Sequence, residues 1–79
     1  MKLAVHTMRK TVFAGESARI TAPTPLGEIT ILENHEPYVT MLAPGEFRYE
    51  DESGQEAAVP IRGGFLEVRR DSDVRVLAD

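Results

Sequence analysis

Apolar side chains recur at every second position along most of this chain. That period is typical of β-strands that turn one face toward a core and the other toward water. No segment of ten or more residues carries apolar positions at helical spacing without an interrupting Pro or Gly. The pattern predicts an all-β chain, with strands at the apolar pairs Leu3 and Val5, Ile20 and Ala22, Ile29 and Ile31, Val39 and Met41, Phe47 and Tyr49, Leu66 and Val68, and Val74 and Val76.

Turn-forming residues separate these runs at short intervals, among them Pro44-Gly45 and Gly63-Gly64. Many short strands with frequent turns indicate a sandwich or a barrel. Pro60 falls within the run 55–61. Because proline cannot donate to a β-ladder, we expect that strand on a sheet edge or broken at this point. The acidic run 50–52 is expected at a solvated hairpin tip.

The chain has 79 residues, which suits a single domain over residues 1–79. A core of this size supplies about 3–5 kcal/mol of net stability, and small domains often add a disulfide, a metal or a partner. Cysteine is absent, so neither a disulfide nor a thiolate metal site can form. A surface that binds a partner is therefore an attractive expectation.

The formal net charge of −4 argues against nucleic acid as a partner, because affinity for phosphate backbones comes from clustered Lys and Arg. The nine basic residues are scattered along the chain. No apolar run approaches the ~18–20 residues that a membrane-spanning helix needs. We expect a soluble chain that faces the cytoplasm and reaches a membrane only by docking to other proteins.

Three stretches, taken in order and at their spacing, carry a resemblance to a known family. The first is Val12-Phe13-Ala14-Gly15-Glu16 after the opening strand, and the second is the segment 26–37 with Gly27-Glu28 and His35. The third combines residues 42–45, 63–68 and 74–79, which read LAPG, GGFLEV and VRVLAD. Together they resemble the N-terminal β-sandwich domain of the epsilon subunit of F-type ATP synthase. The resemblance implies a flattened antiparallel β-sandwich of about ten short strands, and it is weakest at Thr30, Glu33 and Asn34.

The resemblance also implies a function. Epsilon subunits are non-catalytic rotor subunits of the central stalk, and they couple rotation of the membrane c-ring to the gamma subunit during ATP synthesis. The expected partners are therefore gamma and the c-ring, in a proton- or sodium-transporting complex on the cytoplasmic face of the bacterial inner membrane, with no cofactor. The resemblance ends where many epsilon subunits continue into a helical hairpin, so we expect neither the ATP binding nor the braking of hydrolysis that the family assigns to it. A natural short form and a fragment fit the sequence equally well.

The resemblance places a candidate c-ring interface on five residues: Glu28, Asn34, His35, Pro37 and Tyr38. Each has a simpler interpretation. Glu28 would serve equally as an exposed carboxylate at a strand start, His35 as a hydrogen-bonding turn residue, and Tyr38 rather better as a core aromatic. No catalytic or metal-binding spacing accompanies His35, because the other histidine, His6, is distant in sequence and neither one has a His-x-x-x-His or paired-carboxylate spacing.

Two further patterns have a functional and a structural interpretation. Gly63-Gly64 lacks the Lys-Ser/Thr and the following helix of a phosphate loop, so a tight turn or bulge is expected there. Four aromatic residues could form a stacking platform for single strands, but they alternate with polar residues and core packing accounts better for them; they are Phe13, Phe47, Tyr49 and Phe65. The rival functions are a small β-barrel module that binds nucleic acid, carbohydrate or peptide and, more remotely, a hydrolase.

Overall fold

The computed structural model describes residues 1–79 and contains nine strands and no helix. The strands are β1 (Lys2–Thr7), β2 (Thr11–Glu16), β3 (Arg19–Thr24), β4 (Gly27–Leu32), β5 (Tyr38–Leu42), β6 (Gly45–Glu50), β7 (Glu56–Ile61), β8 (Gly64–Arg69) and β9 (Asp73–Ala78). The all-β prediction is confirmed, with nine strands in place of about ten. The chain has no helix that is long and apolar enough to cross a membrane.

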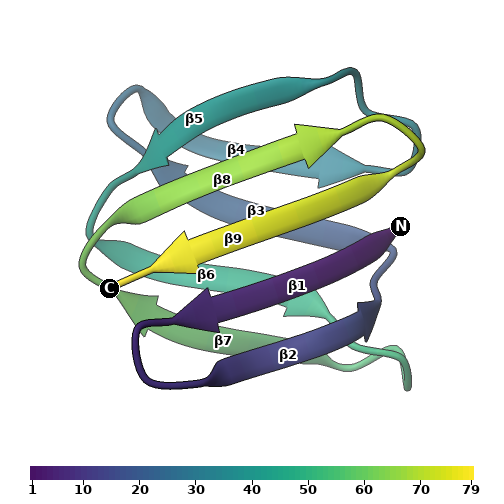
Figure 1. The fold of residues 1–79 in the computed structure, drawn as a ribbon, viewed down its shortest axis with the longest axis horizontal. Helices are drawn as coiled ribbons and strands as arrows, with labels where there is room; N and C mark the ends of the chain where they lie inside the picture. The colour runs from purple at the N-terminus through teal and green to yellow at the C-terminus, as the bar shows by residue number, and fades with distance from the viewer.

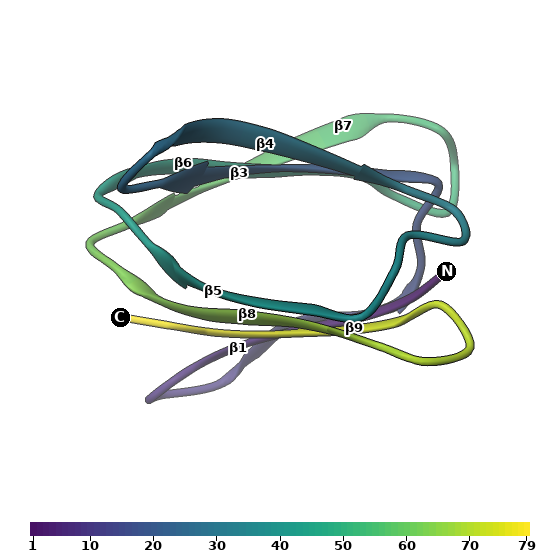
Figure 2. The same cartoon turned by 90° about the horizontal axis from the view of Figure 1, so that it is seen from above.

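Two sheets stack face to face, as Figures 1 and 2 show from two directions. The five-stranded sheet has the order β2-β1-β9-β8-β5, and the four-stranded sheet has the order β4-β3-β6-β7. The molecule measures 25 × 23 × 19 Å. Strands β4 and β5 are both edge strands and lie along the same side of the sandwich, at the top of Figure 1.

The strand pairs are antiparallel with one exception. β1 and β9 pair in parallel, from Lys2 opposite Asp73 to Thr7 opposite Ala78. The expectation of a wholly antiparallel sandwich is wrong at this pair. A parallel pair needs a long crossover, and here the whole chain between β1 and β9, including the four-stranded sheet, provides it.

The core lies between the sheets and holds fifteen buried hydrophobic residues. Most come from the alternating pairs, and the largest fully buried side chain is Phe47. In β5 the alternation predicts the strand, but its core-facing residue is Leu42, while Val39 and Met41 are 67% and 59% exposed. Strand β7 with Pro60 lies on the edge of the four-stranded sheet, as expected from its proline.

The predicted turns are present. Gly64 has a φ of +133°, and a Cβ placed there would lie 2.1 Å from the backbone oxygen of Leu77, so only glycine fits this approach of β8 to β9. The hairpin between β6 and β7 is closed by Asp51, whose Oδ1 accepts hydrogen bonds from the backbone N–H groups of Ser53 (2.9 Å) and Gln55 (3.0 Å). Both segments are turns in the structure, as the sequence predicts.

Candidate functional site

Four of the five predicted interface residues lie in one exposed segment that connects the two sheets. Residues 33–37 connect β4 to β5 and are called here the interface loop, with Tyr38 at its end as the first residue of β5. Asn34 has a φ of +62°, the left-handed conformation that asparagine tolerates. Its N–H donates to the Ser72 hydroxyl oxygen at 3.4 Å, which ties the loop to the turn between β8 and β9.

His35 is held locally. Its Nδ1 lies 2.7 Å from the backbone oxygen of Glu36, and since a carbonyl oxygen only accepts, Nδ1 carries the hydrogen. Its ring centroid is 5.8 Å from that of Tyr38. Tyr38 is 39% exposed, so the preference for a core aromatic was wrong. The two rings form a small exposed pair beside the loop.

Glu28 is not close to this group. It lies near the start of β4, and the interface loop follows the end of β4, so about 17 Å of strand separates them. Its Oε2 accepts a hydrogen bond from the Arg48 guanidinium at 3.1 Å. A partner that contacts both Glu28 and the loop must therefore extend along the whole β4 edge.

Arg48 organises the outer face of the four-stranded sheet, a role that sequence reasoning missed. Besides Glu28, it lies 4.0 Å from carboxylate oxygens of Glu46 and Glu56. Thr21, opposite Arg48 in the register with β3, is only 7% exposed. The one available signal was the alternation Phe47-Arg48-Tyr49, which puts Arg48 on the outer face of a central strand.

The outer face of the five-stranded sheet carries an apolar patch beside its charged side chains. Met41, Phe65 and Leu77 are register neighbours across β5, β8 and β9. With Val39 they form an apolar patch, in which each side chain is between 55% and 67% exposed. The sequence held a signal for it, because Phe65-Leu66 and Val76-Leu77 place apolar residues on both faces of a strand. The core interpretation is therefore wrong for Phe65, although Phe47 and Tyr49 are buried and Phe13 packs against Tyr49 with ring centroids 4.6 Å apart.

No constellation for bond chemistry stands out. His6 Nδ1 lies 3.0 Å from the Thr11 hydroxyl on the five-stranded sheet, away from His35 in the loop. No group of three or more His, Asp or Glu side chains is placed to hold a metal ion. Burial of the phenol raises the pKa of Tyr49, and the nearby charge of Asp51 raises it further. The notable features of the surface are the loop, the β4 edge and the apolar patch.

A model of the β-sandwich domain of the ATP synthase delta/epsilon chain matches residues 1–79. The chain belongs to this family. It is 39% identical to the ATP synthase epsilon chain of Dichelobacter nodosus over 70 residues, which cover 89% of this chain and 48% of that protein. The chain thus spans about half the length of the relatives that it matches. The family resemblance seen in the sequence is confirmed.

Solved structures agree with this membership. The fold matches a chain in the mitochondrial ATP synthase of Euglena gracilis, with a TM-score of 0.88, 32% identity, and coverage of 96% of this chain and 48% of that one. It also matches a chain in the central stalk and c-ring of the Tetrahymena thermophila mitochondrial ATP synthase, with a TM-score of 0.84 over 99% of this chain and 62% of that one. At 19% identity the second likeness concerns the fold alone.

Proposed function

We propose that this chain is a non-catalytic rotor subunit of the central stalk of an ATP synthase, where it couples the c-ring to the gamma subunit. Two comparisons support this: the chain belongs to the delta/epsilon family of ATP synthase, and a solved chain that is 32% identical to it comes from a structure of OSCP, F1 and the c-ring. On this proposal the chain acts on the cytoplasmic face of a bacterial inner membrane, through the complex. It performs no bond chemistry itself.

The main support for this proposal is the apolar patch, which we propose as the surface that binds gamma. Four of the eight exposed large hydrophobic residues of the chain lie in it, on three adjacent strands. Contiguous exposed apolar surface marks an interaction site more often than scattered apolar residues do. The patch also adjoins a free sheet edge, β5, whose sequence YVTML has neither a charged residue nor a proline to protect it. A partner that covers the patch and the β5 edge would remove this apolar surface from water.

The c-ring contact is assigned to the interface loop and the β4 edge. His35, Pro37 and Glu36 are exposed and polar or small, which suits the rim of an interface better than its centre. Glu28 lies on the same edge strand, where a carboxylate directs register more than affinity. The sandwich between patch and loop is close-packed and leaves no buried side-chain polar atom without a hydrogen bond. Such an interior resists shear, as a coupling element requires.

Binding to gamma tests the assignment of the patch. Leu77 and Leu32 are the same residue type, both are 55% exposed, and they lie on different sheets. Leu77→Glu should weaken binding to purified gamma by about 100-fold or more, because a carboxylate would be buried in an apolar contact. Leu32→Glu is the matched control and should bind as the parent does. Equal affinities for the two variants, or no binding of the parent chain, would refute the assignment.

Reconstitution of the parent chain with gamma and the c-ring tests the assignment of the loop and the β4 edge to the ring. His35→Ala and Glu28→Lys should reduce co-purification of the ring while leaving binding to gamma alone unchanged. Because Glu28→Lys also disturbs Arg48, the control is Glu46→Lys, which changes a carboxylate of the same cluster on the central strand β6. Normal assembly with both His35→Ala and Glu28→Lys would show that the ring contacts a different surface.

A further inference from the structure

The outward sides of β8 and β9 carry side chains that meet in three register pairs: Phe65 with Leu77, Glu67 with Arg75, and Arg69 with Asp73. These six residues are called here the hairpin face. The first pair is apolar and belongs to the apolar patch. The other two pairs join opposite charges and continue the face toward the β8–β9 turn. The two strands therefore present matching chemistry, position by position.

The charges of the hairpin face are little used within the chain. Asp73 lies 3.9 Å from an Arg69 nitrogen and 3.8 Å from an Arg75 nitrogen, too far for hydrogen bonds. Glu67 lies opposite Arg75 in the register but forms no ion pair in the structure. These groups therefore keep hydrogen-bonding capacity that a partner can use.

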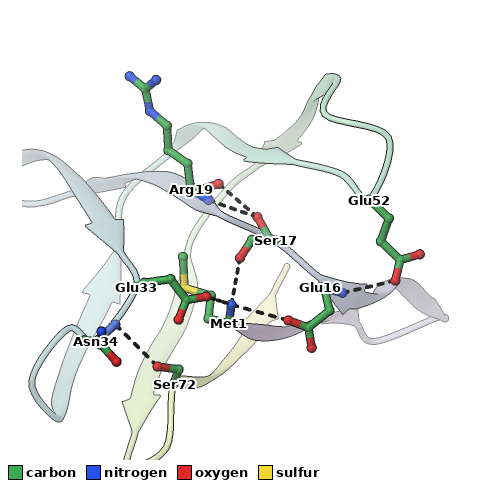
Figure 3. A network of polar contacts seen from close by, with 8 residues as sticks. All are labelled: Met1, Glu16, Ser17, Arg19, Glu33, Asn34, Glu52 and Ser72. Carbon is green, nitrogen blue, oxygen red and sulfur yellow. Dashed lines mark hydrogen bonds and ion pairs between the residues drawn. The ribbon is translucent and has the colours of Figure 1, made fainter.

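The hairpin that carries this face is held firmly in place. The Ser72 hydroxyl in its turn accepts a hydrogen bond from the Asn34 N–H at 3.4 Å (Figure 3), and the Ser72 backbone oxygen accepts one from the Lys2 N–H at 2.8 Å. β8 and β9 are each paired on both sides, with β5 and β1 as their outer neighbours. A face that is already ordered has a lower entropic cost of binding.

A shallow hollow opens on the hairpin face. It is lined by His6, Val76 and four residues of the face: Phe65, Glu67, Arg75 and Leu77. Apolar side chains thus lie beside charged ones around one depression. This is the composition of an interface, whose centre is apolar and whose rim is polar.

A two-fold axis parallel to the strands, between β8 and β9, makes the hairpin face complementary to itself. This axis places each β8 residue of the face over its own register partner in a second copy of the chain. Phe65 then meets Leu77, Glu67 meets Arg75, and Arg69 meets Asp73. Each contact occurs twice, as in any isologous interface. Apolar groups meet apolar groups, and every charge on the face meets its opposite.

The same axis brings the rest of the apolar patch into the contact. β5 comes to lie over β1 of the second copy, because these strands flank the hairpin on its two sides. From the registers, Met41 then faces His6, and Val39 faces Ala4. All four residues of the patch are covered, and no like charges are placed opposite each other.

We propose that a second copy of this chain covers the hairpin face, in a two-fold symmetric dimer that forms while no other partner occupies the apolar patch. The dimer goes beyond the function proposed above, because it needs only the isolated chain. If gamma binds the same patch, the dimer and the gamma complex exclude each other. Ten residues per copy meet in this contact, fewer than the about 20–30 of a standard interface, so the dimer is weak.

Sedimentation of the isolated chain at increasing concentration tests the dimer. The parent should show a monomer–dimer equilibrium with a Kd on the order of 0.1 mM, as a small contact gives. Glu67→Arg and Arg75→Glu should each weaken self-association by about tenfold or more, because each places like charges opposite one another across the axis. A parent that stays monomeric at about 1 mM, ten times that Kd, would overturn the proposal.

A mixture of the two variants tests the two-fold arrangement. Glu67→Arg makes the centre of the face basic, and Arg75→Glu makes it acidic, so each variant repels its own copy and matches the other. The equimolar mixture should dimerise at least as well as the parent. A mixture that stays monomeric while the parent dimerises would refute this arrangement.

The matched controls are Arg9→Glu and Glu36→Arg, the same charge reversals at exposed positions outside the hairpin face. Each should self-associate as the parent does, and mixing them should add nothing. Self-association weakened equally by these controls would show that net charge, and not the face, governs it. Circular dichroism checks that every variant is folded.

NMR of the parent maps the contact without any variant. Backbone signals of residues 65–69 and 73–77 should shift as the concentration rises, while those of β6 and β7 on the other sheet stay in place. Shifts confined to β5 would indicate pairing of sheet edges and overturn the proposal. Purified gamma should release the monomer. A gamma complex that retains both copies would overturn the mutual exclusion and the assignment of the patch to gamma, but not the dimer.

Discussion

On the outer face of the four-stranded sheet Arg48 lies among three carboxylates, whereas on the outer face of the five-stranded sheet four large apolar side chains are open to water. The guanidinium lies 3.1 Å from Glu28 and 4.0 Å from both Glu46 and Glu56. The apolar patch has no such cover, and its residues are at least 55% exposed. The two faces are built on the same strand alternation, and only the residues at the outward positions differ.

The sheet edges differ in the same way. Edge strand β7 carries Glu56 and Pro60, which discourage pairing with another strand, whereas edge strand β5 carries neither charge nor proline. Exposed ion pairs contribute little to stability, about 0–1 kcal/mol each, so the Arg48 cluster is better understood as a surface suited to water than as a source of stability. The charged face of the four-stranded sheet is therefore suited to contact with water. The apolar patch on the five-stranded sheet is suited to contact with a partner.

The largest loss of stability is expected from a substitution at Gly64, where β8, a strand of the apolar face, approaches β9. In Gly64→Ala the new Cβ would lie 2.1 Å from the Leu77 oxygen and 2.8 Å from the Ala78 Cα, both in β9. Backbone cannot yield there without separating β8 from β9, so we expect a loss of about 3 kcal/mol or more. A core of this size supplies only about 3–5 kcal/mol. Circular dichroism at 25 °C should show a largely unfolded chain.

Gly27→Ala is the control for this substitution. Gly27 also has a positive φ, +121°, but no atom lies within 4 Å of a Cβ placed there. The strain alone should cost about 1 kcal/mol, measured by urea unfolding. If the two alanine variants were equally stable, the close approach of β8 to β9 would not be what requires glycine.

The fold was largely predictable because the alternation of apolar residues is local information. Strand alternation at Leu66 and Val68 or at Val74 and Val76 fixes which side of each strand meets the core. The parallel pairing of β1 with β9 was not predictable in this way, since it joins the two ends of the sequence. Neither strand has a residue pattern that distinguishes a parallel neighbour from an antiparallel one.

The candidate surfaces were less predictable because they depend on which strands become neighbours. The resemblance indicated His35 and Glu28 as residues of one interface, whereas the structure places Glu28 near the start of β4 and His35 in the loop beyond its end. Phe65 was assigned to the core although its neighbour Leu66 occupies the buried position, and the alternation of Leu66 and Val68 already indicated an outward Phe65. The hydrogen bond between Asn34 and Ser72 spans 38 residues, and no short motif could indicate it.

A smaller effect is expected from removing the charge cluster on the other face. Arg48→Met keeps an unbranched apolar side chain over Thr21 but leaves three carboxylates without their cation. We expect a loss of about 1 kcal/mol at low salt and less in about 0.5 M salt, where exposed charges are screened. The comparison variant is Arg75→Met on the five-stranded sheet, where Arg75 has only a 3.8 Å contact with Asp73. Urea unfolding of the two should rank Arg48→Met as the less stable, and the reverse order would show that the three contacts of Arg48 contribute less to stability than the single contact of Arg75.

The smallest effect on stability is expected in acid, and it too arises in the four-stranded sheet, at the β6–β7 turn. Hydrogen bonds from the Ser53 hydroxyl, then from the backbone N–H groups of Gln55, Ser53 and Gly54, lower the pKa of Asp51 below its ordinary value of 3.8. A carboxyl group with a lowered pKa stabilises the fold fully above its unfolded pKa and loses that contribution as pH falls through its folded pKa. The free energy of unfolding should therefore fall as the pH is lowered through and below 3.8. It should fall less in Asp51→Asn, whose amide oxygen still accepts hydrogen bonds but does not titrate. The residues of the apolar patch do not titrate. The Leu77→Glu chain therefore keeps every acid-sensitive contact of the parent chain. If Asp51→Asn lost as much stability in acid as the parent does, the β6–β7 turn would not be the acid-sensitive element of this face.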